Sequence, residues 1–418
     1  MTAAPRPGRV GHCFFNSLLK LSRAATAALV LASCGGGGSG PPAAMDAVST
    51  PAPGTALPPS GPNVLAITVD RGTDGTAINV PFVAVTVCQP GTDNCLTIDH
   101  VVVDTGSFGL RLKASALGPG LAALPQVANA AGSAVGECAQ FASGRVWGSV
   151  RRADVRLAGE RAADVPIQVV ADPAAPFAAV PASCSALGAD VGVGAGSNGI
   201  LGVGMLAQDC GGACTVSTAP GVYFACPAGG CAGTTLPLAS QVTNPVAAFA
   251  SDNNGVAVML PAVPAGGAGT LSGSLIFGVD TQANNQLGAA TVYQVNGQGN
   301  FTTTYKGLAF TSSFIDSGSN AMFFPDPDIP ECSGFYCPPV PLALTALNTS
   351  ATGVSATVSF TIESVVGIGS TAAAANIGAD VGLTRTFDWG LPFFFGRTVF
   401  VAMRGAATSK GSGPFWAY

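Results

Sequence analysis

The sequence predicts an all-β protein of two domains, and three observations support this. Valine, threonine, phenylalanine and isoleucine occur in short runs between glycine, asparagine, aspartate and proline, which is typical of many strands joined by tight turns. Charged residues make up only 9% of the chain, beside 56 glycines and 31 prolines in 418 residues. Stretches with the 3.6-residue period are scarce, and the length exceeds one ordinary hydrophobic core. We expect one short helix around Ser240–Phe249, capped by Asn244 and starting at Pro245.

The N-terminus has the pattern of an export signal. Basic residues precede the apolar stretch 24–32, which is too short to span a bilayer as a mature helix. It ends in Leu31-Ala32-Ser33-Cys34, which resembles the lipobox of bacterial lipoproteins. The resemblance implies a signal peptide over 1–33 and lipidation of Cys34, with an ordinary signal peptide as the alternative. Residues 34–62 are predicted to be a flexible tether. Gly35 after the lipidated cysteine implies an outer-membrane lipoprotein facing the periplasm or the cell surface.

The cysteines agree with export. Ten of the 12 lie beyond the targeting region, and close pairs flank turn residues, as small-loop disulfides do in an oxidising compartment. The predicted pairs are Cys88 with Cys95, Cys210 with Cys214, Cys226 with Cys231, Cys332 with Cys337 and, as the remainder, Cys138 with Cys184. Spacing does not prove connectivity, and the cysteines from 184 to 231 could pair differently. Zinc is the rival interpretation, but no Cys-x-x-Cys spacing occurs, so we predict no metal site.

Two short motifs carry the candidate chemistry. They are Asp104-Thr105-Gly106-Ser107, after the apolar run 101–103, and Asp316-Ser317-Gly318-Ser319, after Phe314-Ile315. Each motif places a carboxylate just past a buried strand, where a glycine lets the backbone turn tightly. Two such carboxylates brought together share a proton, because both cannot ionise cheaply. One can then act as a base toward water while the other protonates a polarised carbonyl.

Other chemistries fit the chain less well. Of its two histidines, His12 lies in the signal peptide, so a Ser-His-Asp or Cys-His mechanism would have to use His100. We expect His100 to be a strand-end side chain. The few glutamates have no paired context. The stretch 194–199 matches Gly-x-Gly-x-x-Gly but lacks the βαβ unit and the downstream acid of a dinucleotide site. A glycosidase also uses two carboxylates. That interpretation does not explain why both aspartates lie in the same Asp-[Thr/Ser]-Gly-Ser motif.

Further segments occur in the order of a known family. Residues 198–204 contain a hydrophobic-hydrophobic-Gly element, 273–280 a Gly-x-Leu-x-Phe-Gly element, and 390–403 a phenylalanine-rich segment followed by a strand. With the two aspartate motifs, they resemble the pepsin-like aspartic proteases over residues 79–418, and the lipobox suggests a bacterial lipoprotein branch. The resemblance implies two pseudo-twofold-related β-barrel lobes, over 63–255 and 256–418, with an active-site cleft between them.

The resemblance also implies roles at the matched positions. Asp104 and Asp316 would hold the nucleophilic water. The supporting loop residues would be Thr105 and Ser317, which hydrogen-bond across the lobes, Ser107 and Ser319, which bond the outer carboxylate oxygens, and Gly106 and Gly318, which allow close approach.

The flap is where the chain departs from the family. Phe141 stands at the position of the flap tyrosine, so the tyrosine hydroxyl is missing. The tryptophan that partners this tyrosine is replaced near Leu110-Arg111, and Trp147 is a candidate substitute. Phe141 would still close the cleft and exclude water.

The sequence therefore predicts an exported, lipid-anchored aspartic endopeptidase without a cofactor, acting on extended polypeptide in the inter-lobe cleft. The alternative is a catalytically inactive binding or inhibitor-like surface lipoprotein with the same fold. An adhesin or structural surface lipoprotein is a third alternative. The net charge is −5 and basic runs are absent, so nucleic acid is not an expected partner. We expect a monomer held at the membrane by its lipid.

Overall fold

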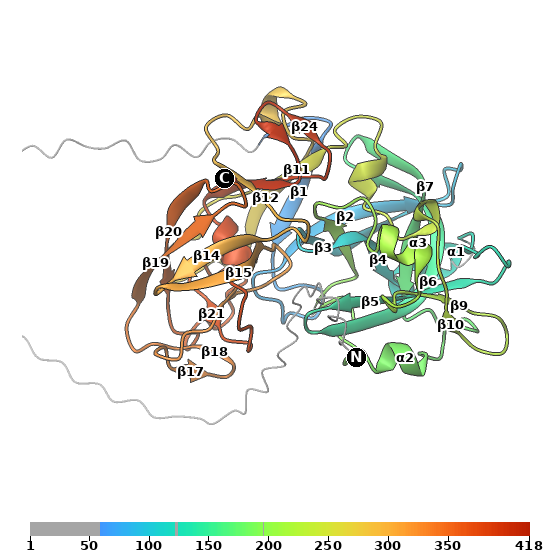
Figure 1. The fold of residues 1–418 in the computed structure, drawn as a ribbon, viewed down its shortest axis with the longest axis horizontal. Helices are drawn as coiled ribbons and strands as arrows, with labels where there is room; N and C mark the ends of the chain where they lie inside the picture. The colour runs from blue at the N-terminus through green and yellow to red at the C-terminus, as the bar shows by residue number, and fades with distance from the viewer. Residues whose placement is uncertain (1–58, 122–123, 195) are drawn as a thin grey trace, which may run out of the picture.

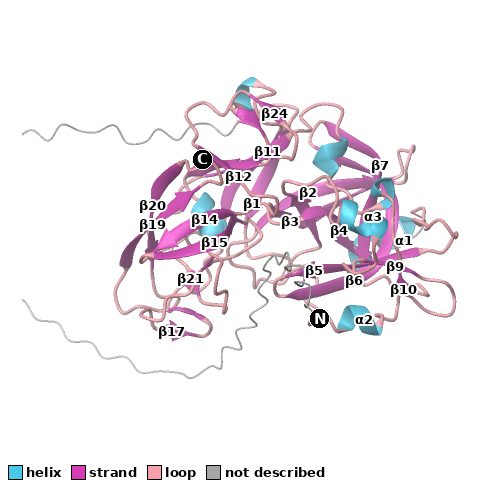
Figure 2. Cartoon of the chain, viewed as in Figure 1, coloured by secondary structure: helices cyan, strands magenta, loops and turns pink. Residues whose placement is uncertain are grey.

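The computed structural model describes residues 59–121, 124–194 and 196–418. Strands dominate this part of the chain, and its helices are short (Figure 2). The strands form two lobes with a sheet between them (Figure 1). The all-β, bilobal architecture expected from the sequence is confirmed. The predicted signal peptide, Cys34 and nearly all of the predicted tether lie outside the described residues. Within the described ranges, no helix is long and apolar enough to cross a membrane.

Six strands of the N-terminal lobe close into a barrel. In order around the barrel they are β2 (Pro81–Cys88), β3 (Cys95–Asp104), β8 (Gly199–Val203), β4 (Phe108–Lys113), β7 (Glu160–Val170) and β6 (Gly144–Leu157). The ring closes because β6 pairs both with β7 and with β2. Side chains alternate across β3, so Val101 and Val103 join the main core while Val102 packs in a second apolar cluster.

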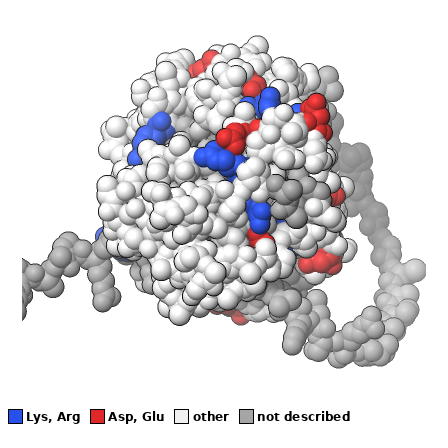
Figure 3. All heavy atoms as spheres, turned by 90° about the vertical axis from the view of Figure 1, so that its right-hand side faces the viewer, with Lys and Arg blue, Asp and Glu red and all other residues white. Residues whose placement is uncertain are grey.

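The remaining elements of this lobe extend the barrel. The sheet continues from β6 through β5 (Val135–Phe141), β9 (Tyr223–Ala225) and β10 (Ala232–Gly233). Three short helices that the sequence did not suggest are α1 (Ala114–Leu121), α2 (Ala182–Ser185) and α3 (Gly212–Val216). On the face in Figure 3, charged side chains of both signs lie in small groups among uncharged residues.

The prediction of a helix over Ser240–Phe249 is wrong. Two separate 3₁₀ turns occur instead, at Leu238–Ser240 and Pro245–Ala248. Asn244 caps the second turn as expected, accepting a hydrogen bond from the Val246 amide at 3.1 Å. Between the turns the backbone bonds to neighbouring segments, for example from the Thr243 amide to the Pro166 carbonyl at 3.1 Å. These long-range bonds take the place of helical ones.

The C-terminal lobe is built on a seven-stranded, nearly closed sheet. Its order is β20 (Ser355–Ile362), β19 (Leu342–Thr349), β14 (Phe301–Tyr305), β15 (Leu308–Ile315), β22 (Asp388–Trp389), β16 (Met322–Phe323) and β21 (Gly378–Ala379). Stacked aromatic rings fill its core: the centroids of Phe324 and Phe387 are 4.6 Å apart, and those of Phe387 and Trp389 are 4.4 Å apart. This packing holds β22 against β15 and so positions the loop after β15.

A shared sheet joins the two lobes. Its strands are β1 (Val64–Val69), β12 (Leu271–Phe277), β11 (Gly255–Leu260), β23 (Arg397–Ala402), β26 (Phe415–Ala417) and β13 (Val292–Gln294). It thus pairs the first described strand with strands from the middle and the end of the chain. The expected border between the lobes, at 255/256, falls at the first residue of β11.

All five disulfides form with the predicted pairing. Four of them close loops of only a few residues, and Cys138–Cys184 ties β5 to α2 across 46 positions. Cys332–Cys337 links a small ribbon of β17 (Glu331–Cys332) and β18 (Phe335–Tyr336). A second ribbon pairs β24 (Ala407–Thr408) with β25 (Gly411–Ser412). The last two 3₁₀ turns are Ala283–Asn285 and Leu391–Phe394.

Candidate active site

The two aspartate motifs lie in equivalent places in the two lobes. Asp104 ends β3, which runs parallel to β8, and β8 pairs antiparallel with β4. Asp316 directly follows β15, which runs parallel to β22, and β22 pairs antiparallel with β16. In each lobe the chain therefore turns after the aspartate. The next strand then pairs with the opposite edge of the neighbour that runs parallel to the first strand. The repeated topology gives the site its pseudo-twofold symmetry.

Reciprocal hydrogen bonds lock the two loops together across the lobes. The Thr105 amide donates to Ser317 Oγ at 3.1 Å, and the Ser317 amide donates to Thr105 Oγ1 at 2.9 Å. Each hydroxyl in turn donates to a carbonyl of the opposite strand, Thr105 to Ile315 at 3.2 Å and Ser317 to Val103 at 2.7 Å. Thr105 and Ser317 thus make the cross-lobe contacts that the resemblance implies.

The glycines after each aspartate are required by space. A Cβ on Gly106 would lie 2.7 Å from the carboxyl carbon of Asp316, and one on Gly318 would lie 2.9 Å from that of Asp104. Each glycine therefore packs directly against the carboxyl group of the opposite lobe. Any larger residue would push the two carboxyl groups apart.

Asp104 accepts hydrogen bonds from the backbone and the serine of its own loop. The amides of Gly106 and Ser107 donate to its Oδ1 at 2.8 and 3.1 Å, and the Ser107 hydroxyl donates to its Oδ2. Three donors on a fully buried side chain stabilise it as a carboxylate.

Asp316 is held by the matching loop of the C-terminal lobe. The Gly318 amide lies 2.7 Å from its Oδ1, and Ser319 Oγ lies 2.9 Å from its Oδ2. Burial raises the pKa of Asp316 well above its usual range, and the neighbouring carboxyl groups of Asp104 and Asp388 raise it further. The raised pKa of Asp316 favours a proton on this carboxyl group, beside that of Asp104.

Comparison with known proteins places the chain in a family. A family model described as a protein of unknown function, DUF3443, matches residues 59–418. The chain belongs to the DUF3443 family. No curated protein matches it. Among solved structures, the crystal structure of the aspartic proteinase from Irpex lacteus is similar over 85% of this chain and 96% of that one, with 16% identity and a TM-score of 0.45.

A cavity of about 140 Å³ opens beside the first loop of this DUF3443 member. Thr105 and Gly106 form part of its wall, together with Phe314, two residues before Asp316. The rest of the wall is mostly apolar, with Phe108, Met205, Leu206, Pro414 and Trp416, beside Arg404 and residues 297–300. The cavity can take an apolar side chain next to the paired carboxyl groups.

Sequence reasoning missed a third carboxyl group at the site. Asp388 is fully buried, and Ser319 Oγ lies 2.7 Å from its Oδ2. Burial raises the pKa of Asp388 well above its usual range, and the charge of Asp104 adds to this. The signal in the sequence was an aspartate in Phe387-Asp388-Trp389, an otherwise aromatic segment just before the glycine of the closing element.

The predicted flap is the hairpin of β5 and β6, where Phe141 pairs with Gly144 at the tip. Phe141 is buried in one apolar cluster with Phe82, Val102 and Ile200 and does not line the cavity beside Thr105.

Trp147 does not take the place of the missing flap partner. Its indole N–H donates to the Phe177 carbonyl at 2.8 Å, and its ring meets Phe224 edge-on. The Arg111 guanidinium lies over the flap residue instead, 5.8 Å from the centre of the Phe141 ring. A cation thus faces the aromatic side chain in this DUF3443 structure.

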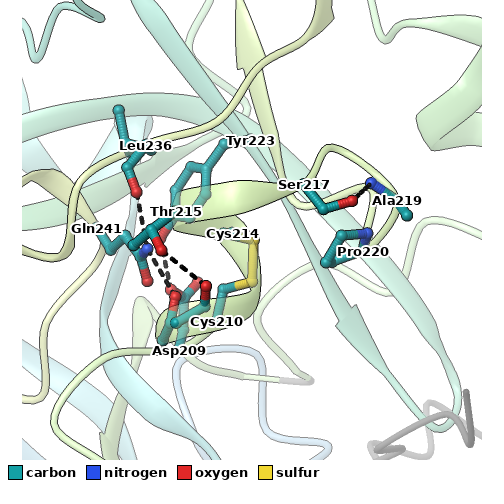
Figure 4. Close-up of a disulfide and its surroundings, with 12 residues drawn as sticks. Asp209, Cys210, Cys214, Thr215, Ser217, Ala219, Pro220, Tyr223, Leu236 and Gln241 are labelled. Atoms are coloured by element: carbon teal, nitrogen blue, oxygen red, sulfur yellow. Dashed lines mark hydrogen bonds between the residues drawn. A yellow bond between two sulfur atoms is a disulfide. The ribbon is translucent and has the colours of Figure 1, made fainter.

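Arg111 belongs to a buried charge cluster that sequence reasoning also missed, since Glu137 had no paired context. Its guanidinium donates to Glu137 at 2.7 Å and to Asp209 at 3.2 Å. Asp209 accepts the Tyr223 hydroxyl beside the Cys210–Cys214 disulfide (Figure 4). Burial raises the pKa of Glu137 well above its usual range, although the Arg111 charge opposes this. The cluster fixes the base of the hairpin to the strand that follows Asp104.

His100 lies within β3 and not at its end. Its Nε2 is 3.3 Å from Asp70 Oδ2, and its Nδ1 is 3.3 Å from Asp99 Oδ2. Within the described residues, no group of three or more histidine, cysteine, aspartate or glutamate side chains could hold a metal ion.

Proposed function

We propose that this protein is an aspartic endopeptidase, in which Asp104 and Asp316 activate a water molecule against a peptide bond. The observation that carries the proposal is the reciprocal pair of loops: each lobe brings one carboxyl group to the shared position, and each glycine packs against the opposite carboxyl. A merely structural aspartate has no need of this arrangement. Holding two buried carboxyl groups in contact is costly, which favours a chemical use for them.

The protonation states suit the reaction. Asp104, with three donors, is the carboxylate that accepts a proton from the attacking water. Asp316, whose pKa is raised by burial and by its charged neighbours, is the acid that protonates the carbonyl oxygen of the substrate. A tetrahedral gem-diol intermediate forms. The proton taken up by Asp104 then passes to the leaving nitrogen as the C–N bond breaks, and Asp316 takes a proton back from one hydroxyl of the gem-diol as the C=O bond re-forms. The pair returns to one proton and one charge.

The substrate would be an extended polypeptide in the cleft between the lobes. The mostly apolar cavity beside Thr105 and Gly106 would receive an apolar side chain next to the cleaved bond. We therefore expect cleavage beside apolar residues and little hydrolysis of highly charged peptides.

The export and lipidation of the chain also remain proposals. The five disulfides support an oxidising compartment. We propose lipidation at Cys34, a tether over 34–62, lobes over 63–255 and 256–418, and a monomer on the outer membrane. No nucleic acid, metal or cofactor has a part in the proposed reaction.

One observation favours the second candidate, an inactive binding scaffold. Phe141 has no hydroxyl to order the flap, and its ring is packed away from the cavity beside Thr105. In that case the cleft would hold a polypeptide without cleaving it.

The test is hydrolysis of an unstructured peptide library by the purified full chain, from acidic to neutral pH. Asp104→Asn and Asp316→Asn should each abolish cleavage. The matched control is Asp93→Asn, because the Asp93 side chain is 95% exposed on the surface, and it should leave cleavage unchanged. Cleavage that survives either site substitution contradicts the proposal. Binding without cleavage by the folded wild-type protein favours the scaffold.

A further inference from the structure

Asp388 occupies a position where the two lobes differ. It lies in β22 and pairs with Phe314 of β15 in the parallel ladder. Phe314 lies two residues before Asp316. In the N-terminal lobe the same register pairs Val102 with Ile200. The pseudo-twofold counterpart of this aspartate is therefore an isoleucine. A carboxyl group has been placed where the other lobe has a hydrocarbon side chain.

The surroundings of Asp388 disfavour a charge. Its exposed fraction is 0%, and its Oδ1 has no hydrogen-bond partner within the described residues. Its neighbours in the sheet, Phe314 on β15 and Phe323 on β16, carry no charge. The charge of Asp104 opposes its ionisation, and the Ser319 hydrogen bond is the interaction that favours it. An ionised carboxylate here would lose its hydrating water. In return it would share the Ser319 hydroxyl with Asp316, so its charge would be poorly compensated.

Counting protons sets the direction of the hydrogen bonds. Ser319 Oγ lies 2.9 Å from Asp316 Oδ2 and 2.7 Å from Asp388 Oδ2. Its hydroxyl has one proton, so it can donate to only one of these two oxygens. The contact with the other oxygen is attractive only if that carboxyl group brings a proton of its own. Asp388, with fewer donors and no direct part in the reaction, is the group that keeps it.

We infer that Asp388 is a neutral carboxylic acid that donates a hydrogen bond to Ser319, whose hydroxyl in turn donates one to Asp316. A third carboxyl group is thus linked by hydrogen bonds to the Asp104–Asp316 pair. The inference rests on the proposed function for its catalytic consequence. When Asp316 gives its proton to the substrate carbonyl oxygen, the negative charge appears at the end of this chain of donors. The two hydrogen bonds then strengthen, and no further proton is transferred. Asp388 is thus a positioning residue for Asp316.

A first test needs no substrate. Infrared spectra of the full chain at neutral pH resolve the C=O stretch of protonated carboxyl groups from carboxylate bands. We expect Asp388→Asn to lose one protonated-carboxyl band, and the exposed control Asp328→Asn, 79% exposed in the same lobe, to lose none. Ser319→Ala should shift this band, because the acid loses its acceptor. A spectrum unchanged by both Asp388→Asn and Ser319→Ala overturns the inference, whether or not peptides are cleaved.

A second test uses hydrolysis. Asparagine keeps an uncharged donor, so Asp388→Asn should retain kcat within about threefold and leave the pH profile in place, whereas Asp388→Leu should lower kcat by about ten- to a hundredfold with little change in KM. Equal kcat and pH profiles for the asparagine and leucine variants overturn the inference. If the wild-type protein cleaves nothing while Asp388→Asn loses its infrared band, the proposed function fails and the protonated Asp388 stands.

Discussion

Replacing Arg111 by methionine should destabilise the protein by about 3–5 kcal/mol at neutral pH, because it breaks a buried ion pair from one side. The Arg111 side chain is 4% exposed, and its guanidinium lies 2.7 Å from Glu137 and 3.2 Å from Asp209. Methionine keeps much of the aliphatic volume but leaves the Glu137 carboxyl, which is fully buried, without its cation. The remaining charge must then stay buried unpaired or take up a proton.

The size of the effect should depend on pH with a definite sign. Burial raises the pKa of Glu137, and losing the Arg111 charge raises it further. At acidic pH, below the ordinary carboxyl range, both the folded and the unfolded variant hold this proton, and the penalty is smallest. As the pH rises, the unfolded chain releases the proton first. Wild type loses stability in parallel at first, because its Glu137 pKa is also raised. Once Glu137 of folded wild type has ionised, the free energy of unfolding of Arg111→Met falls relative to wild type, by up to about 1.4 kcal/mol per pH unit.

Urea unfolding at a series of pH values from acidic to alkaline measures this difference. Arg156→Met is the matched control, because Arg156 pairs with the exposed Asp93 on the surface and should change little. The double variant Arg111→Met/Glu137→Met should recover much of the loss, since both buried charges are then replaced by apolar side chains. The reasoning is refuted if Arg111→Met behaves like Arg156→Met, if its penalty is the same across the whole pH series, or if the double variant recovers nothing.

Three further predictions concern the site and the disulfides. Gly318→Ala should abolish peptide hydrolysis and cost about 1–3 kcal/mol of stability, because the new Cβ would lie 2.9 Å from the carboxyl carbon of Asp104. Asp388→Asn should gain stability over wild type as the pH rises, by up to about 1.4 kcal/mol per pH unit, because the raised pKa of Asp388 makes only the folded wild type hold that proton. Replacing Cys138 and Cys184 by serine should cost about 4 kcal/mol in urea unfolding, because this disulfide closes a loop of 46 positions.

Each of these predictions has a control in the same chain. Gly229→Ala has open space around its new Cβ and should leave hydrolysis and stability unchanged. Asp328→Asn, at an exposed site, should show no growing gain with pH. Serine at Cys226 and Cys231 should cost about 2 kcal/mol, since the loop is only five positions long. A Gly318→Ala protein with normal hydrolysis, a pH-independent Asp388→Asn effect, or equal losses for the two disulfides would contradict the respective argument.

Much of the architecture could be predicted because its signals are local. Short apolar runs between turn residues indicate strands, and this held for β3 and β15, which lead to Asp104 and Asp316. Close cysteine spacing predicted four of the pairs, and elimination predicted the fifth. Capping chemistry at Asn244 was also correct, although the turn it caps is 3₁₀. The prediction of a full helix there was wrong, because backbone hydrogen bonds to distant segments replaced the helical ones. No local sequence pattern reveals such bonds.

By itself the sequence determined the chemical groups and the strands that carry them: an aspartate, a hydroxyl and a glycine at the end of each of two apolar strands. Only the tertiary structure decided which distant groups meet. Arg111 and Asp209 are 98 positions apart, and Ser319 and Asp388 are 69 apart, yet each pair is joined by a hydrogen bond. The sequence order predicts Phe141 to be a flap residue, but its side chain lies in the buried apolar cluster of Val102 and Ile200. The reason is physical: a period of two or a turn motif is set by neighbouring residues, whereas the charge and the proton of a buried group are set by whatever the fold packs around it.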